Sequence, residues 1–291
     1  MAILNERDLK RREGVLQGLE KNRIPVDQAI ERLLEIWPDD PLPYTLKGTE
    51  LVKAGDTAEA EEWLWKAMER QPRSPDAYLH LTMARSGQDP QDILSRHLVC
   101  LVFQKLGAEE TIPDDLAEQF GEALEGAGQD PKNPTSYMLV AKVMEQSLPP
   151  LPPDVEGRLY PFRLLTRIQT DIIDEQLLNE VLENAESITP VLRGALREWS
   201  MRTAHDEEAV CAIAALLGEI GPPDALEELM QTCSFPERDV SLHAAWGAWR
   251  LGQRFPAEAL QQFRAMLPGD SVAARVTIAE LVGMLPDIPG R

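Results

Sequence analysis

Histidine and cysteine are the residues with which this chain could hold a metal ion or attack a substrate, and both are scarce. They are His80, His97, His205, His243, Cys100, Cys211 and Cys233. His97 and Cys100 are three residues apart on a predicted helix, so both could face one metal ion. A zinc site requires three or four ligands, and no second pair lies nearby in the sequence. We therefore expect both residues to be structural.

The other candidates for chemistry lead to the same expectation. His205-Asp206 is similar to the pair used by metal phosphohydrolases, but it stands alone at a helix start, where Asp is an ordinary cap. Cys211 lies among Ala and Leu, the surroundings of an inert core thiol. The sequence also lacks G-x-S-x-G, P-loop and G-x-G-x-x-G motifs. We expect no catalysis, no cofactor and no metal.

The composition narrows the choice of partner and compartment. Twenty-nine Lys and Arg against 49 Asp and Glu give the 291 residues a net charge of −20, which argues against nucleic acid and anionic membranes as partners. The first residues become charged after Met-Ala-Ile-Leu, and no run of about 18 apolar residues occurs. Three widely spaced cysteines suit a reducing compartment. We expect a cytoplasmic protein.

The strongest charge feature is acidic. Eight acids and no bases lie between residues 109 and 130, and Glu118, Glu122 and Glu125 share one helix face. The simpler interpretation is the solvated face of an irregular insertion near 107–130. The alternative is a docking face for a basic partner, because a focused field raises association rates.

A P-x-x-P-x-x-Y string occurs three times, at 38–44, 72–78 and 131–137. The first two copies are 34 residues apart. Since Pro cannot continue a helix but suits its first turn, each copy predicts a helix stop, a turn and a helix start. Between the first two copies, apolar residues recur every three or four positions on both sides of a break at 53–56, which predicts a helical hairpin.

This hairpin resembles a tetratricopeptide repeat (TPR). The positions that the family favours are occupied by Tyr44, Gly48, Gly55, Ala60, Ala67 and Pro72. Lys47 departs from the usual Leu. Units starting at Pro75 and Pro134 match less fully, and a unit at 5–37 keeps only the period and the closing Pro. The resemblance implies helical repeats over residues 1–147.

TPR proteins commonly bind peptides along their first helices. The resemblance assigns to that face Thr45, Thr49, Val52, Lys53, Leu79, Met83, Met138 and Lys142. Thr45 and Thr49 lack the Asn and the cation of the chaperone-binding clamp. The mixed, partly apolar face is therefore expected to suit an extended or helical peptide.

A Pro-rich stretch, Leu-Pro-Pro-Leu-Pro-Pro, begins at residue 148, and we expect a stiff connector at 148–157. Beyond it, at 158–291, the stretches 206–221 and 237–252 share an acidic start, paired Ala and a Leu-Gly or Ile-Gly end. They resemble short bacterial HEAT repeats. Gly221 and Gly252 are expected to end helices. Second helices are expected at 224–230 and 256–266, and a further first helix at 270–282.

Several cations and tryptophans have two possible roles. Arg163/Arg167 and Arg193/Arg197 are spaced i, i+4, and we expect them to pair within the chain, with Asp171 and Glu198 nearby, rather than bind an acidic partner. Trp63 and Trp246 are predicted in the core. Trp65 and Trp249 could be exposed anchors.

Together these features predict an all-α protein, an α-α superhelix (solenoid) of TPR-like and HEAT-like hairpins. The expected role is a non-catalytic scaffold or adaptor that binds another protein or peptide on a concave surface. Because short bacterial HEAT repeats also occur in bilin lyases, the alternative is a ligand- or chromophore-handling protein, which would need an enclosed apolar cavity.

Overall fold

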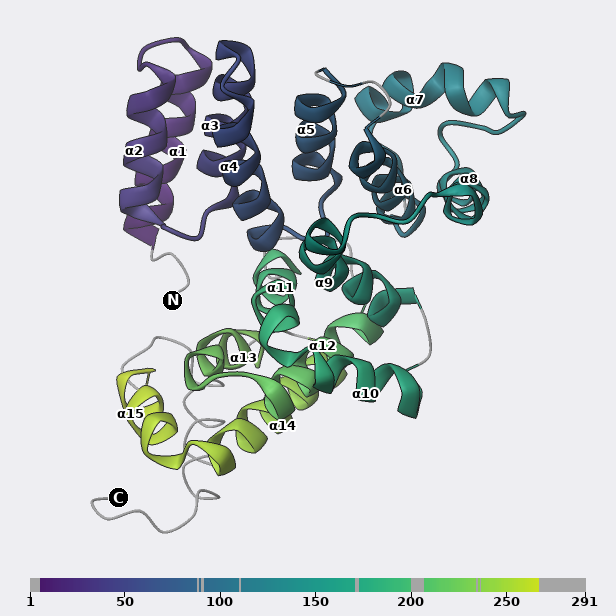
Figure 1. Cartoon of the computed structure of the whole chain (residues 1–291). Helices are drawn as coiled ribbons and strands as arrows, with labels where there is room; N and C mark the ends of the chain where they lie inside the picture. The colour runs from purple at the N-terminus through teal and green to yellow at the C-terminus, as the bar shows by residue number, and fades with distance from the viewer. Residues whose placement is uncertain are drawn as a thin grey trace. The chain divides into compact units, whose positions relative to one another are not determined.

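The computed structural model describes residues 6–87, 89, 92–109, 111–170, 173–199, 207–233, 235 and 237–266, and the regular elements within these ranges are all helices (Figure 1). They form two compact units, an N-terminal unit from Glu6 to Thr166 and a C-terminal unit that begins at Arg167. The expected all-α fold is confirmed. The division between the units falls inside a helix, whereas the sequence suggested the connector at 148–157. The helix expected at 270–282 lies outside the described residues.

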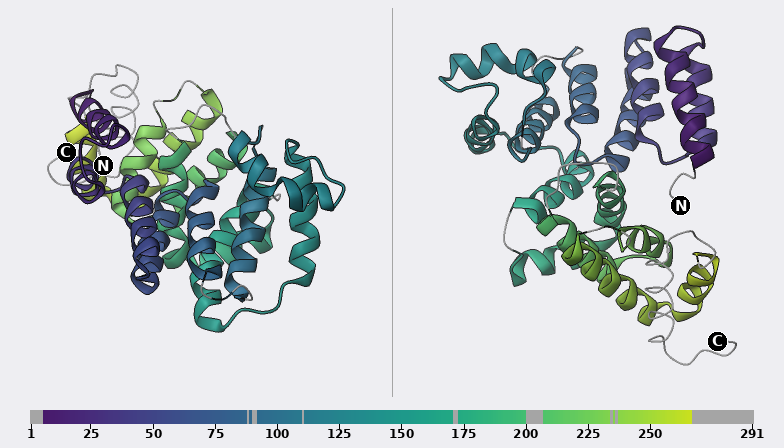
Figure 2. Two further views of the ribbon diagram at one scale, coloured as in Figure 1. Left: turned by 90° about the horizontal axis from the view of Figure 1, so that it is seen from above. Right: turned by 180° about the vertical axis from the view of Figure 1, so that it is seen from behind.

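The N-terminal unit is built from helices that pack on their neighbours in sequence. They are α1 (Glu6–Glu20), α2 (Val26–Ile36), α3 (Pro41–Ala54), α4 (Thr57–Arg70), α5 (Pro75–Ser86), α6 (Ile93–Gly107), α7 (Asp114–Gly126), α8 (Pro134–Ser147) and α9 (Pro153–Thr170). α3 and α4 stand side by side in every view, with α1 and α2 beside them (Figures 1 and 2).

The C-terminal unit also pairs consecutive helices, and α12 and α14 form its most extensive contact. Its elements are α10 (Glu175–Glu183), α11 (Ala185–Trp199), α12 (Glu207–Ile220), the 3-10 turn η1 (Pro223–Ala225), α13 (Leu226–Thr232), α14 (Arg238–Arg254) and α15 (Pro256–Met266). The expected second helices at 224–230 and 256–266 correspond to η1–α13 and α15.

Each P-x-x-P-x-x-Y string starts a helix by the same two contacts. The residue before the second Pro caps the helix: the side chains of Asp40, Ser74 and Asn133 accept hydrogen bonds from the backbone N–H two residues on. The tyrosine hydroxyl donates to the carbonyl of the first Pro, at 2.7 Å in the first two copies and 2.9 Å in the third. The string therefore fixes both the helix start and the path of the chain before it.

Glycines set the spacing of the first hairpin. A Cβ on Gly48 of α3 would lie 2.6 Å from Cγ of Leu64 on α4, so only glycine permits this approach. Gly55 ends α3 with φ of +88°, a left-handed conformation that other residues adopt at a cost. The close approach lets Leu64, Ala60 and α3 share one buried seam.

The acidic segment near 107–130 is not irregular, which corrects the sequence interpretation. α7 is a regular helix whose Leu116, Ala117 and Leu124 are buried. Phe120 stacks edge-on against Phe103 of α6 and Tyr137 of α8. An apolar stripe thus anchors α7 on the hairpins around it, and the acids occupy the opposite face.

The C-terminal unit also depends on glycine. A Cβ on Gly218 of α12 would lie 2.5 Å from Cα of Gly247 on α14, so the two helix backbones touch. Nη1 of Arg254 donates to the carbonyls of Gly218 and Gly221, at 3.3 and 3.2 Å, and thereby caps the end of α12. Gly221 follows the last residue of α12 as predicted. The prediction for Gly252 was wrong, because α14 continues through this buried residue to Arg254.

Among the described residues, no helix combines the length and the hydropathy that crossing a bilayer requires.

Gly48→Ala is expected to lower the free energy of unfolding by about 1–3 kcal/mol, because the new methyl group overlaps Leu64 and the backbone of α3 must shift. Gly121→Ala in α7 is the matched control. A Cβ there meets nothing within 4 Å, so helix propensity alone predicts stabilisation of about 1 kcal/mol. Urea denaturation of both variants measures the difference. If Gly48→Ala left the free energy of unfolding unchanged, or raised it as Gly121→Ala is expected to do, the result would contradict the close packing of α3 on α4.

Candidate functional site

The first-helix surface is formed by α3 and α5, which contact each other directly. Thr45, Thr49 and Val52 on α3 are half-buried, and Met83 on α5 is 57% exposed. Oγ1 of Thr49 donates to the carbonyl of Thr45 at 2.8 Å and lies 3.4 Å from Nδ1 of His80 on α5. The contact between Thr49 and His80 therefore places residues of α3 and α5 on one surface.

His80 of α5 also belongs to this surface, although the repeat pattern in the sequence did not indicate it. The pKa of the His80 imidazole is lowered, and burial is the largest cause. Asp76 raises this pKa and Lys53 lowers it further. His80 is consequently neutral at pH 7 and offers one donor and one acceptor. Lys53 is exposed and paired with Glu50 at 2.7 Å.

Three predicted surface residues lie elsewhere. Leu79 is 8% exposed, so its side chain belongs to the core rather than to a binding surface. Met138 of α8 packs against Gly107 at the end of α6. A Cβ built on Gly107 would lie 3.0 Å from the Cβ of Met138. Lys142 is exposed, but α8 packs principally on α6. The third unit thus does not extend the α3–α5 surface in the way that the repeat pattern implied.

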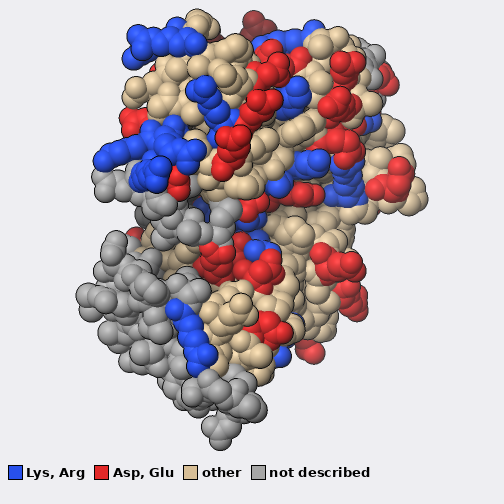
Figure 3. Space-filling view, turned by 90° about the vertical axis from the view of Figure 1, so that its left-hand side faces the viewer, with Lys and Arg blue, Asp and Glu red and all other residues tan. Residues whose placement is uncertain are grey.

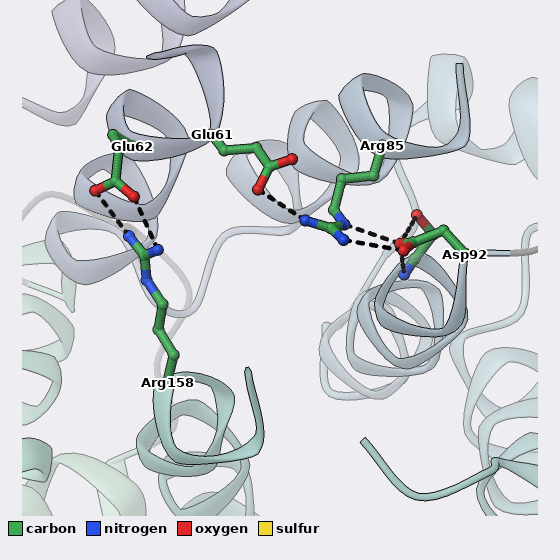
Figure 4. A network of polar contacts seen from close by, with 6 residues as sticks. Glu61, Glu62, Arg85, Asp92 and Arg158 are labelled. Atoms are coloured by element: carbon green, nitrogen blue, oxygen red, sulfur yellow. Dashed lines mark hydrogen bonds and ion pairs between the residues drawn. The ribbon is translucent and has the colours of Figure 1, made fainter. Parts of the chain in front are cut away.

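A polar network fixes α5 between its neighbours (Figure 4). Nε and Nη2 of Arg85 donate to Asp92, at 2.9 and 3.0 Å, and Nη1 donates to Glu61 of α4 at 2.7 Å. Asp92 also caps α6 by accepting from the backbone N–H and the hydroxyl of Ser95, both at 2.8 Å. The hydrogen bond from Arg85 holds the pKa of Asp92 below its usual value. These hydrogen bonds hold α5, and with it one side of the α3–α5 surface, in a fixed position between α4 and α6.

The predicted acidic docking face lies on α7. Glu118, Glu122 and Glu125 are exposed, and Lys132 pairs with Asp114 at the start of the same helix at 2.9 Å. The negative charge of the chain is not uniform over its surface. The face that carries α1 and α2 presents Lys and Arg among Asp and Glu (Figure 3).

His97 and Cys100 are engaged by packing contacts. Nε2 of His97 donates to the carbonyl of Pro149 at 2.8 Å, and the thiol of Cys100 points at the carbonyl of Ala141 at 3.5 Å. Burial raises the pKa of Cys100 to about 11 and that of Cys233 to about 12, so both thiols are protonated at pH 7. Within the described ranges, no group of three His, Cys, Asp or Glu could hold a metal ion. His205 and Asp206 lie outside them.

The arginine pairs bind acids of the chain, as expected, and Asp171 lies outside the described residues. Arg163 contacts Glu156 at 2.6 Å, and Arg167 contacts Glu180 at the same distance. Arg193 and Arg197 converge on Glu228, at 2.9 and 3.5 Å, and Glu228 is buried. Arg193 and Arg197 thereby join α11 to α13, and losing both cations would leave the buried carboxylate of Glu228 without compensation.

Two tryptophans exchange their predicted roles. Trp65 is 3% exposed and lies under Arg158 and beside Phe162. Trp246 is 44% exposed, with Leu242 one turn before it at 54%. This exposed apolar pair on α14 was missed. Its signal in the sequence is the i, i+4 spacing opposite the stripe of Ala244, Ala248 and Leu251, all of which are buried.

Comparison with protein-family models, with curated proteins and with solved structures finds no match to this chain.

Trp65→Ala is expected to lower the free energy of unfolding by about 3–5 kcal/mol, because it opens a cavity under Arg158 and Phe162. Trp246→Ala removes a side chain that is largely in solvent, so we expect a loss below about 1 kcal/mol. Thermal and urea unfolding of the two variants test the assignment. A larger loss for Trp246→Ala than for Trp65→Ala would contradict it.

Proposed function

We propose that this protein is a non-catalytic scaffold of TPR-like and HEAT-like hairpins that binds a peptide segment of another protein. The single observation that supports this most is the surface shared by α3 and α5. Two helices one hairpin apart in sequence meet there through Thr49 and His80, and Met83 is exposed on the same helix as His80, three residues further on. An accessible thioether near polar groups is typical of peptide-binding surfaces. Such surfaces bury an apolar side chain of the peptide and form hydrogen bonds with its backbone.

The surface also suggests the chemistry of the ligand. Thr45, Thr49 and neutral His80 offer hydrogen bonds without a net charge, whereas Lys53 is neutralised by Glu50. A segment with an apolar anchor for Met83 and free backbone groups for the hydroxyls would match it. A carboxylate-specific clamp would need unpaired cations at these positions. We therefore propose an internal segment of a partner rather than a free C-terminus.

We further propose a cytoplasmic setting. Its support is that Cys100, Cys211 and Cys233 are all free thiols and that two of them are buried. A chain with sparse, unpaired thiols suits a reducing compartment.

Site-specific photocrosslinking in the cells of origin tests the proposed surface. A photoreactive phenylalanine analogue is placed at Lys53 or at Met83, both exposed, and at Glu69 of α4 as the control. We expect one protein to be captured from the first two positions and not from Glu69. Capture of the same protein from all three positions, or of none, would overturn the proposal.

Met83→Glu should then weaken binding of the captured partner by about tenfold or more, because burying a Met side chain contributes about 1.5–3 kcal/mol. Glu69→Lys, an equally exposed change on α4, should leave the affinity within about twofold. Titration calorimetry with the purified partner gives both values. An unchanged affinity for Met83→Glu would place the binding surface elsewhere.

A further inference from the structure

His97 joins three segments of the N-terminal unit through the two nitrogens of one ring. It lies on α6 and is 6% exposed. Nε2 contacts the carbonyl of Pro149 in the Pro-rich connector at 2.8 Å, and Nη2 of Arg163 on α9 contacts Nδ1. The same guanidinium donates twice to Glu156 on α9, at 2.6 and 2.9 Å.

The chemistry of the two partners fixes the protonation state of the ring. A carbonyl can only accept, so Nε2 must carry a hydrogen. A guanidinium can only donate, so Nδ1 must present its lone pair. Both contacts therefore exist only when His97 is neutral. A proton on Nδ1 would remove the hydrogen bond from Arg163 and set two cations against each other.

The charged groups around the ring act in both directions. Burial lowers the pKa of His97 most, the hydrogen bond to Pro149 raises it, Arg163 and Arg96 lower it, and Glu156 raises it. Glu145 of α8 acts on Cys100, which lies one turn further along α6. The outcome is a pKa below 6.5, so protonation is resisted while the contacts hold.

We propose that His97 is a proton-operated latch that holds the connector at 148–152 and the first turn of α9 against α6 and releases them in mild acid. The release is local. Arg158 binds Glu62 at 3.0 and 3.1 Å, and Phe162 packs on Trp65 and Tyr78, through contacts that do not involve the His97 ring. These contacts keep the rest of the first half of α9 in place.

The pH window follows from linkage. The closed form has the lowered pKa and the open form the ordinary one, so the open form binds more protons. Lowering the pH below about 6.5 therefore raises the opening equilibrium by up to about tenfold per pH unit, until the pKa of the closed form is reached. Above that window the opening equilibrium no longer depends on the protonation of His97, and the closed form keeps its full stability.

Hydrogen exchange of the intact protein, corrected for the intrinsic pH dependence, tests the latch between about pH 7.5 and about pH 5.5. We expect faster exchange in acid at the amides of Leu148, Leu151 and residues 154–157, and no such change in α3 or α4. His97→Gln, which can donate to Pro149 and accept from Arg163 at any pH, should abolish the response. His80→Gln, the matched control, should retain it. No acid response in the native protein, or a full response in His97→Gln, would overturn the proposal.

Nitrogen NMR of the histidine rings keeps the proposal testable if His97→Gln does not fold. The native protein should show His97 with its hydrogen on Nε2 and with a pKa below that of an unstructured histidine. Arg163→Met should raise the pKa of His97, because it removes both the donor to Nδ1 and the neighbouring positive charge. A hydrogen on Nδ1, or a pKa that does not move in Arg163→Met, would refute the latch.

Discussion

The hydrogen bond from a tyrosine hydroxyl to a proline carbonyl six residues earlier is the contact on which the N-terminal unit depends. In each of three strings the tyrosine folds the incoming chain back onto the helix that it begins. The two prolines lower the conformational entropy lost in forming the bend, because their φ is already fixed and one of them occupies the first helical turn. A buried hydroxyl requires a partner, so the bend and the core are satisfied by the same side chain.

The rings of these tyrosines then organise the packing between hairpins. Tyr44 packs on Trp63, with Arg70 over its face. Tyr78 and Phe162 form a T-shaped pair, and Tyr137 meets Phe103 and Phe120. One residue type therefore closes a turn locally and joins elements that are distant in sequence. The anchoring of α7 and of the first half of α9 both derive from this arrangement.

Several arginine side chains connect neighbouring helices in this molecule. Arg85, Arg193 and Arg250 each bridge neighbouring helices by binding acids, and Arg250 and Glu219 are 31 residues apart. Exposed pairs of this kind contribute little stability, and buried ones set register more than they stabilise. On α7, by contrast, Glu118, Glu122 and Glu125 are exposed to solvent. The proposed selectivity of the α3–α5 surface rests instead on hydroxyl, imidazole and thioether groups.

Local rules made much of this fold predictable from the sequence. Proline, capping residues and glycine specify helix starts and ends through backbone geometry, which is why the hairpin of α3 and α4 and the second helices of the C-terminal unit lie where their patterns predicted. Gly252 shows the limit of these rules, since packing against neighbouring helices can carry a helix through a glycine.

Other features depended on contacts between segments far apart in the chain. Periodicity indicates that a helix has an apolar face, but not which neighbour covers it, so the roles of Trp65 and Trp246 were reversed and Leu79 was placed on the surface. The partners of His97 are 52 and 66 residues away along the chain, a distance over which no spacing rule operates. The sequence determined the helices and their order. Only tertiary packing decided which side chains remain exposed and which protonation state a buried ring must adopt, because burial and partner geometry arise when the helices meet.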